Sequence, residues 1–217
     1  MNNQDILNTI EEKKIIVIVR RTYGENLIKL AGALYKGGIR LIEVTFDQAD
    51  PECLKKTGEA IKTLNENFPD MLIGAGTVLN KEQVDAAYKA GGKFIISPNT
   101  NGTVIGYTKE LGLVSIPGAM TPTEIISAHE FGADLVKVFP AAYLGLGYLK
   151  DIKGPISHVK LLATAGIKEE NFGEYLKAGY IGAGISGRLT EKAVIESGNF
   201  DEFTKRAEAF CKIAREN

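Results

Sequence analysis

The sequence predicts one α/β domain over residues 1–217, folded as a (β/α)8 TIM barrel with an additional N-terminal helix. Short β-branched runs alternate with amphipathic helical stretches along the whole chain, which indicates parallel strands joined by right-handed crossovers. Eight such runs recur at an average spacing of about 25 residues, the size of a compact barrel unit. An open doubly wound sheet would show the same alternation, but no glycine-rich dinucleotide fingerprint opens the first crossover.

The strand candidates are rich in residues that suit a pleated sheet. They are residues 15–19, 41–45, 71–73, 94–96, 113–116, 135–139, 159–162 and 180–183. The helical segments between them include 25–36, 52–67, 81–89 and 123–131. Start signals support these helices, since Asn80 stands at capping-box spacing and Pro122 follows Thr121, and glycines such as Gly37 and Gly91 provide stop signals. No linker or composition break divides the series.

Composition excludes several classes of protein. The formal charge is −1 and no basic run is present, so a nucleic-acid partner is not expected. The apolar runs are far shorter than a membrane span, and residues 1–14 lack the order of a signal peptide. Cys53 and Cys211 are expected to be reduced thiols, because they are far apart in sequence and form no paired spacing. A cytoplasmic protein is therefore expected.

Polar residues stand near the ends of several predicted strands, where a barrel of this kind builds its active face. Because side chains alternate along a strand, Glu43 shares the interior face of the second strand with Leu41, and Lys137 shares that of the sixth with Leu135. The polar residues expected at this rim are Arg20, Glu43, Thr45, Thr77, Lys137 and Thr164.

Lys137 carries the sharpest chemical signal. It lies between Val136 and Val138 in a strand that should be buried, although lysine is rarely buried without a partner. Burial and a nearby cation both lower the pKa of an amine, and a neutral amine is a nucleophile toward carbonyl groups. Two structural interpretations compete with this one: a lysine that reaches solvent at the strand end, or one fixed by Glu43 as an ion pair.

Glu43 is the natural base. A carboxylate inside a barrel is costly to keep dry unless it has a partner or a task. An enzyme that joins such an amine to a keto substrate must move a proton at the carbon beside the iminium, and a carboxylate in hydrogen-bond reach, or one water away, can do so. A purely structural ion pair with Lys137 or Arg20 is the alternative.

The loops after the last two strands are candidates for phosphate binding through backbone N–H groups. They read Thr164-Ala165-Gly166-Ile167 and, in the second loop, Gly182-Ala183-Gly184-Ile185-Ser186-Gly187-Arg188, where Ser186 and Arg188 could add a hydroxyl and a charge. Short loops also need glycine for geometry alone, so this alternative stays open. The predicted phosphate-binding residues are Ala165, Gly166, Gly184 and Ser186.

Neither histidine belongs to a recognisable metal-ligand constellation. His129 falls in a predicted helix and His158 near the start of the seventh strand. We therefore expect no metal and no cofactor, and interpret both histidines as surface or packing residues.

Several motifs, taken in order and spacing, resemble one known family from end to end. They are Ile18-Val19-Arg20, Gly37-Gly38-Ile39, Ile42-Glu43-Val44-Thr45, Ile73-Gly74-Ala75-Gly76-Thr77-Val78, Ile96-Ser97-Pro98, Pro117-Gly118, Thr121-Pro122-Thr123-Glu124 and Val136-Lys137-Val138-Phe139-Pro140. The family is that of the 2-keto-3-deoxy-6-phosphogluconate (KDPG) aldolases, also called 4-hydroxy-2-oxoglutarate (KHG) aldolases.

The resemblance implies a class I aldolase of carbohydrate metabolism that cleaves a keto-deoxy phosphosugar acid to pyruvate and an aldehyde, and that forms a homotrimer. It implies that Lys137 forms the Schiff base and that Glu43 moves protons. The substrate-binding residues that it implies are Arg20, Thr77, Pro98 and Thr164.

The chain departs from the family pattern at several positions. Asp47 stands where many members carry an arginine for the carboxylate of pyruvate, so either Arg20 replaces that arginine or the substrate differs. Ala165-Gly166 replaces a Gly-Gly pair, and Ser186-Gly187 replaces Gly-Ser. Asn99 is more similar to the related phosphogalactonate aldolases, which leaves the stereochemistry of the sugar open.

Two other functions fit the same residues. One is a phosphosugar isomerase or epimerase with Glu43 as its only base. The other is a catalytically altered barrel that binds a phosphorylated metabolite, which Asp47 motivates.

Overall fold

The computed structural model of the protein describes residues 2–217, and Met1, the first residue of the predicted domain, lies outside the described residues. Helices and strands alternate along it. The helices are α1 (Asn3–Lys13), α2 (Gly24–Lys36), α3 (Cys53–Asn67), α4 (Lys81–Lys89), α5 (Gly102–Glu110), α6 (Pro122–Glu130), α7 (Ala141–Lys153), α8 (Glu169–Ala178), η1 (Gly187–Leu189), α9 (Lys192–Ser197) and α10 (Asp201–Glu216). The strands are β1 (Ile15–Val19), β2 (Leu41–Thr45), β3 (Leu72–Gly76), β4 (Phe94–Ile96), β5 (Val114–Ile116), β6 (Gly118–Ala119), β7 (Val136–Val138), β8 (Leu161–Thr164) and β9 (Ala183–Ile185).

The strands form a ring that closes through a broken strand. Their order is β5-β4-β3-β2-β1-β9-β8-β7-β6, and each pairing is parallel. β5 and β6 are two pieces of one barrel strand separated by Pro117: β5 pairs with β4, and β6 pairs with β7. Proline cannot donate to a ladder, but its carbonyl still accepts a hydrogen bond from Lys137 N at 2.8 Å. The predicted eight-stranded barrel is confirmed, with its fifth strand divided.

The predicted boundaries are exact for three strands and one helix. Residues 15–19, 41–45 and 94–96 are strands as predicted, and 81–89 is a helix as predicted. The predictions at 71–73, 159–162 and 180–183 both begin and end too early. β3, β8 and β9 end at Gly76, Thr164 and Ile185, and each contains glycine or alanine, which have little strand propensity.

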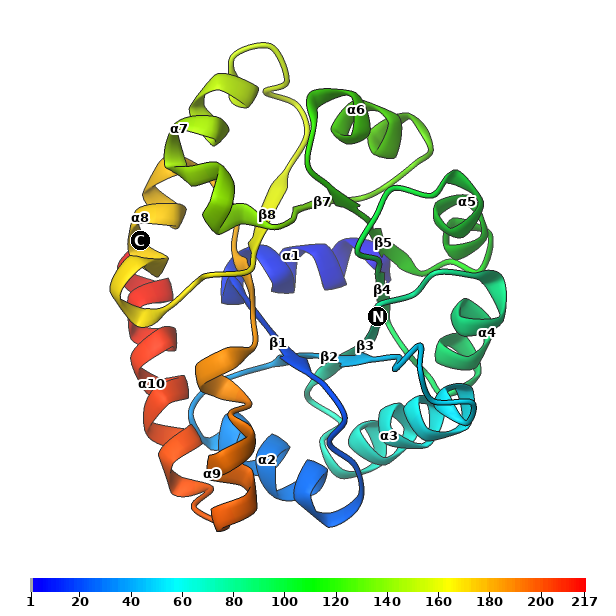
Figure 1. Cartoon of the computed structure of the whole chain (residues 1–217), viewed down its shortest axis with the longest axis vertical. Coiled ribbons are helices and arrows are strands. Elements are labelled where there is room, and N and C mark those ends of the chain that lie inside the picture. Colours follow the sequence, from blue (N-terminus) through cyan, green and yellow to red (C-terminus); the bar gives the residue numbers. More distant parts are fainter. Residues whose placement is uncertain (1) are drawn as a thin grey trace.

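An apolar cluster fills the N-terminal half of the barrel. Its strand residues are Ile16, Leu41, Leu72, Phe94, Ile96, Val114, Ile116, Leu135 and Leu162. Ile6 and Ile10 of α1 join the cluster, so this helix closes the N-terminal end of the barrel. Figure 1 shows α1 crossing the ring of strands, with the other long helices around the outside.

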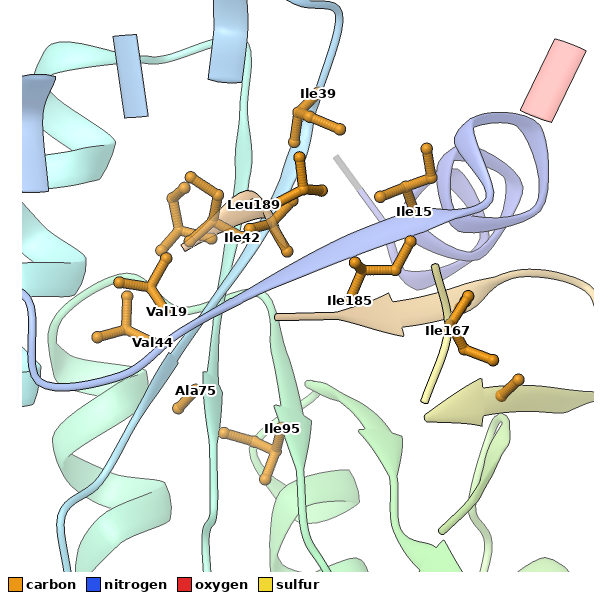
Figure 2. Packing of buried hydrophobic residues seen from close by; sticks show 14 of the residues in the cluster. Ile15, Val19, Ile39, Ile42, Val44, Ala75, Ile95, Ile167, Ile185 and Leu189 are labelled. Carbon is orange, nitrogen blue, oxygen red and sulfur yellow. The ribbon is translucent and has the colours of Figure 1, made fainter. Parts of the chain in front are cut away.

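A second apolar layer lies between the strands and the outer helices. Val17, Val19, Ile42 and Val44 point into it, alternating with the residues that face the barrel interior. Figure 2 shows part of this layer. The predicted interior faces of the second and sixth strands are therefore confirmed, and the C-terminal half of the interior is left to polar side chains. No helix in residues 2–217 is long and apolar enough to cross a membrane.

Candidate active site

Lys137 and Glu43 lie inside the barrel, next to the apolar interior cluster on the C-terminal side. Both side chains are nearly inaccessible: the exposed fraction is 5% for Lys137 on β7 and 1% for Glu43 on β2. The Nζ atom of Lys137 lies 5.2 Å from the centroid of the Phe139 ring. The side chain does not extend into bulk solvent, so the interpretation of a lysine that reaches water at the strand end does not hold.

The charges of the two groups influence each other, although the groups form no contact pair. Among the described residues, no ion pair of 4.0 Å or less joins Lys137 to Glu43. Glu43 Oε2 is buried and has no hydrogen-bond partner. An unpartnered buried carboxylate oxygen is unusual, because its desolvation is uncompensated. The carboxylate is therefore free to bind a water molecule or a reacting group.

Burial shifts the two groups in the directions that covalent chemistry requires. Desolvation lowers the pKa of Lys137; the charge of Glu43 opposes this shift, and the charge of Arg20 adds to it. Desolvation also raises the pKa of Glu43, against the opposing charges of Lys137 and Arg20. Both shifts favour the neutral forms, an amine that can attack a carbonyl and a carboxyl group that can carry a proton.

Two glycines of β3 make room for this arrangement. A Cβ atom on Gly76 would lie 1.6 Å from Glu43 Oε1, and one on Gly74 would lie 2.3 Å from the ring of Phe94. The register of β2 and β3 explains the contact between Gly76 and Glu43. Gly76 pairs with Thr45, which is two residues beyond Glu43 on the same face of β2. Gly76 is a residue of the candidate site that the sequence analysis missed, and the spacing of Gly74 and Gly76 was the available signal.

The predicted threonines differ in their surroundings. Thr164 at the end of β8 is buried, and its Oγ1 has no hydrogen-bond partner. Thr77 follows β3 with φ of 57°, a left-handed conformation that is uncommon for a β-branched residue, and its carbonyl accepts a hydrogen bond from Gln48 Nε2 at 2.8 Å. Pro98 lines neither of the two cavities described below, and its carbonyl packs against Gly118 of β6.

Two cavities open above the buried pair. The larger, of about 800 Å³, is bordered by Phe139, which follows Lys137 on the same face, and by Thr164. The smaller, of about 620 Å³, is bordered by Thr45, which follows Glu43 on the same face, and by Thr77. Arg20 borders both cavities. Lys137 and Glu43 border neither cavity themselves; the residues that follow them on the same faces, Phe139 and Thr45, separate them from the two openings.

The four predicted phosphate residues all border the larger cavity. They are Ala165, Gly166, Gly184 and Ser186. Ala165 and Gly166 both have positive φ, 79° and 77°, so the chain turns sharply after β8. A Cβ atom on Gly166 would lie 2.2 Å from Cβ of Ala142, which explains the glycine by packing as well as by conformation.

The hydroxyl of Ser186 already takes part in a hydrogen-bond chain. Thr190 Oγ1 donates to the carbonyl of Ile18 at 3.3 Å and lies 3.1 Å from Ser186 Oγ. Thr190 has a single hydroxyl proton, so Ser186 is the donor in the second bond. Arg188, which borders the larger cavity, forms in contrast one long contact of 3.4 Å with Glu169. A ligand can therefore bind the Arg188 guanidinium by breaking only this long contact, whereas binding the Ser186 hydroxyl proton would break its hydrogen bond to Thr190.

No group of three or more acidic, histidine or cysteine side chains in residues 2–217 is arranged to hold a metal ion. The rings of His129 and His158 stack edge to face at 5.0 Å, and both are exposed. They lie at the C-terminal end of α6 and before β8, at the end of the barrel opposite the candidate site.

Comparison with family models and with curated proteins identifies one family. A family model described as KDPG and KHG aldolase matches residues 6–206. The chain is 34% identical to 2-dehydro-3-deoxy-phosphogluconate aldolase of Haemophilus influenzae over 92% of each chain. It is 32% identical to 2-dehydro-3-deoxy-6-phosphogalactonate aldolase of Escherichia coli K12, over 93% of this chain and 95% of the relative.

A solved structure extends the comparison to chemistry. KDPG aldolase from Legionella pneumophila, with pyruvate captured as a covalent carbinolamine intermediate, superposes with a TM-score of 0.83 at 30% identity. The match covers 93% of this chain and 95% of that one. The chain belongs to the KDPG and KHG aldolase family, and it is an aldolase.

Proposed function

We propose that Lys137 is the Schiff-base lysine of this aldolase and that Glu43 is its proton carrier. The observation that carries the proposal is a lysine that is 5% exposed, has a lowered pKa and stands beside a buried carboxylate with an unpartnered oxygen. The resemblance of the Val136–Pro140 and Ile42–Thr45 segments to the family motifs supports the same assignment.

The reaction follows from these two groups. The neutral amine of Lys137 adds to the C2 carbonyl of the keto acid to give a carbinolamine, which loses water to form an iminium. The C3–C4 bond then breaks: its electrons move to the iminium nitrogen, the C4 hydroxyl gives up its proton, and the aldehyde leaves. Glu43 accepts that proton and returns one to C3 of the enamine, directly or through one water. Addition of water to the new iminium releases pyruvate and regenerates the amine.

Charge distribution suggests how the substrate is oriented. The charge of Arg20 acts on the pKa of both Lys137 and Glu43. Its guanidinium is therefore suited to bind the substrate carboxylate that is next to C2. Thr77 borders the smaller cavity and Thr164 the larger one, so each offers a hydroxyl to the substrate, and we include Pro98 on the family resemblance alone. The loops at Ala165–Gly166 and Gly184–Ser186 fit a phosphate on the far end, with Arg188 nearby. We propose KDPG or a related keto-deoxy phosphosugar acid as substrate, with KHG as a smaller one.

One alternative substrate has its own support. Asn99 is more similar to the phosphogalactonate aldolases, and a relative with that activity is 32% identical to this chain. The two phosphosugar acids differ in configuration at C4, the carbon that becomes the aldehyde. Activity on the galactonate-derived acid is therefore the second candidate.

We also propose that the chain works as one domain, as a homotrimer and in the cytoplasm. The family resemblance supports the trimer. Exposed apolar side chains before and on α4 and after α6, namely Leu79, Tyr88 and Phe131, support an interface between copies. The free thiols of Cys53 and Cys211 support a reducing compartment.

Borohydride trapping tests the central assignment. With pyruvate present, reduction should add one pyruvate-derived group to Lys137, identified by peptide mass spectrometry, and Lys137→Arg should remain unmodified. In Glu43→Gln the adduct should still form, while pyruvate release from a panel of keto-deoxy phosphosugar acids and KHG should fall. An adduct on another lysine, or none at saturating pyruvate, would contradict the proposal.

A further inference from the structure

Asp47 and Arg21 form a two-point ion pair at the mouth of the barrel. Arg21 Nε lies 2.7 Å from Asp47 Oδ2, and Arg21 Nη2 donates to Asp47 Oδ1 at 3.0 Å. Asp47 Oδ1 also accepts a hydrogen bond from Ala49 N at 3.2 Å, which orients the carboxylate. The planar guanidinium and the carboxylate match in geometry, which makes this pair more specific than a single-contact surface ion pair.

The ion pair gives two consecutive arginines, Arg20 and Arg21, different surroundings. Arg21 has φ of 51°, a left-handed conformation that is uncommon for a residue with a long side chain. Its guanidinium is held at Asp47, whereas Arg20 forms no ion pair within the described residues and borders both cavities. The strained backbone and the bidentate contact together leave one arginine paired and the other available.

We propose that Asp47 and Arg21 are a positioning pair that sets the charge at the keto-acid end of the site. Asp47 holds Arg21 aside, so that Arg20 is the guanidinium available to the carboxylate of the substrate. Arg21 in turn neutralises Asp47, whose charge would otherwise repel that carboxylate or capture Arg20. This inference rests on the proposed function, because it assigns Arg20 to the carboxylate of a keto acid bound at Lys137.

Charge counting gives the expected order of variants. The smaller cavity is bordered by Arg20, Arg21 and Asp47, which sum to one positive charge. Arg21→Ala leaves Arg20 and Asp47 to cancel each other. Asp47→Asn leaves two positive charges, and the double variant leaves Arg20 alone, so its net charge equals that of the native site. Affinity for a carboxylate should therefore be lost in Arg21→Ala and restored in the double variant.

The experiment measures the pyruvate concentration that half-saturates borohydride trapping at Lys137. We expect Arg21→Ala to raise this concentration on the order of tenfold, the effect of one uncompensated charge in a partly solvated site. We expect Asp47→Asn to lower or preserve it, and Arg21→Ala with Asp47→Asn to return to within about threefold of the native protein, as charge balance requires. The limiting trapping rate should stay within about twofold throughout, because Lys137 and Glu43 are unchanged.

The control is the exposed ion pair of Lys29 and Glu25 on α2, which has the same length of 2.7 Å but lies away from the cavities. Lys29→Ala, alone or with Glu25→Gln, should leave the half-saturating concentration unchanged. Thermal melting verifies that each variant is folded. A further readout is salt: the deficit of Arg21→Ala should shrink at high ionic strength, which a purely steric effect would not do.

The outcomes separate the two proposals. If the native protein is not trapped by pyruvate at all, the proposed function fails before any variant is compared. If the native protein is trapped and Arg21→Ala binds pyruvate as well as it does, the positioning pair is wrong. It is also wrong if the double variant binds as weakly as Arg21→Ala, since removing the charge of Asp47 would then restore nothing.

Discussion

Replacing Gly76 by alanine tests whether the position of the Glu43 carboxylate depends on a missing side chain in the neighbouring strand. The new Cβ would lie 1.6 Å from Oε1, 2.3 Å from Cδ and 2.4 Å from Cγ of Glu43. Carbon atoms prefer separations of about 3.5–4.0 Å, so the whole outer half of the glutamate has to move, by more than about 1 Å. A displacement of that size in a catalytic group costs about 100-fold in rate, and overpacking a core costs roughly 1–3 kcal/mol.

The assays are the rate of pyruvate release and the midpoint of urea unfolding. Gly106→Ala is the matched control, because Gly106 lies within α5 and a Cβ atom there meets nothing within 4 Å. It should stabilise the protein by roughly 0.5–1 kcal/mol and leave the rate unchanged. Adding Glu43→Ala to Gly76→Ala removes the clashing atoms, so the double variant should regain stability relative to Gly76→Ala but stay inactive.

Two results would refute this reasoning. The first is a Gly76→Ala protein with activity within about threefold of native, which would mean that the carboxylate needs no defined position. The second is a double variant no more stable than Gly76→Ala, which would mean that the cost comes from the β3 backbone and not from Glu43.

Three other predictions concern charge. Arg20→Ala should raise the pKa of Lys137, because the charge of Arg20 lowers it. The low-pH limb of the pH profile of the borohydride trapping rate should therefore move to higher pH, and a limb that does not move would contradict this prediction. Lys137→Met should be more stable than native at pH 7, and the difference should shrink as the pH rises toward 10.5. The pKa of Lys137 is lower in the folded than in the unfolded protein, so the native protein gains stability as the pH rises between these two pKa values. Urea unfolding at pH 7 and pH 10 measures the difference. Arg188→Ala should lower kcat/KM for phosphorylated substrates by about 10- to 100-fold while changing kcat/KM for KHG less than about threefold, as loss of one phosphate contact would; equal losses on both would remove Arg188 from the phosphate end.

The barrel was predictable from sequence because its strands carry the required alternation. Ile16 and Leu41 point inward and Val17 and Ile42 outward, as the period of two predicts. The break at Pro117 was not predicted: a proline between two apolar runs can end a strand as well as divide it, and only pairing with both neighbours distinguishes these cases.

The candidate site was predictable only in part. Lys137 and Glu43 stand out because charged residues in buried strands are rare. The contact between Gly76 and Glu43 depends on the register of β2 and β3, which a single sequence does not specify. The pairing of Asp47 with Arg21 depends on how two loops turn after β1 and β2, so the sequence left Asp47 facing a substrate carboxylate with no partner.

The most direct test of the account is a pH titration of Lys137 itself in the ligand-free protein. The side-chain carbon next to Nζ can be followed by NMR after selective lysine labelling, with Lys137→Arg used to assign its signal. The account predicts a midpoint clearly below the ordinary value of 10.5, because burial disfavours the charged amine. A midpoint at or above 10.5 would contradict it, since Lys137 would then remain charged at neutral pH and could not attack a carbonyl.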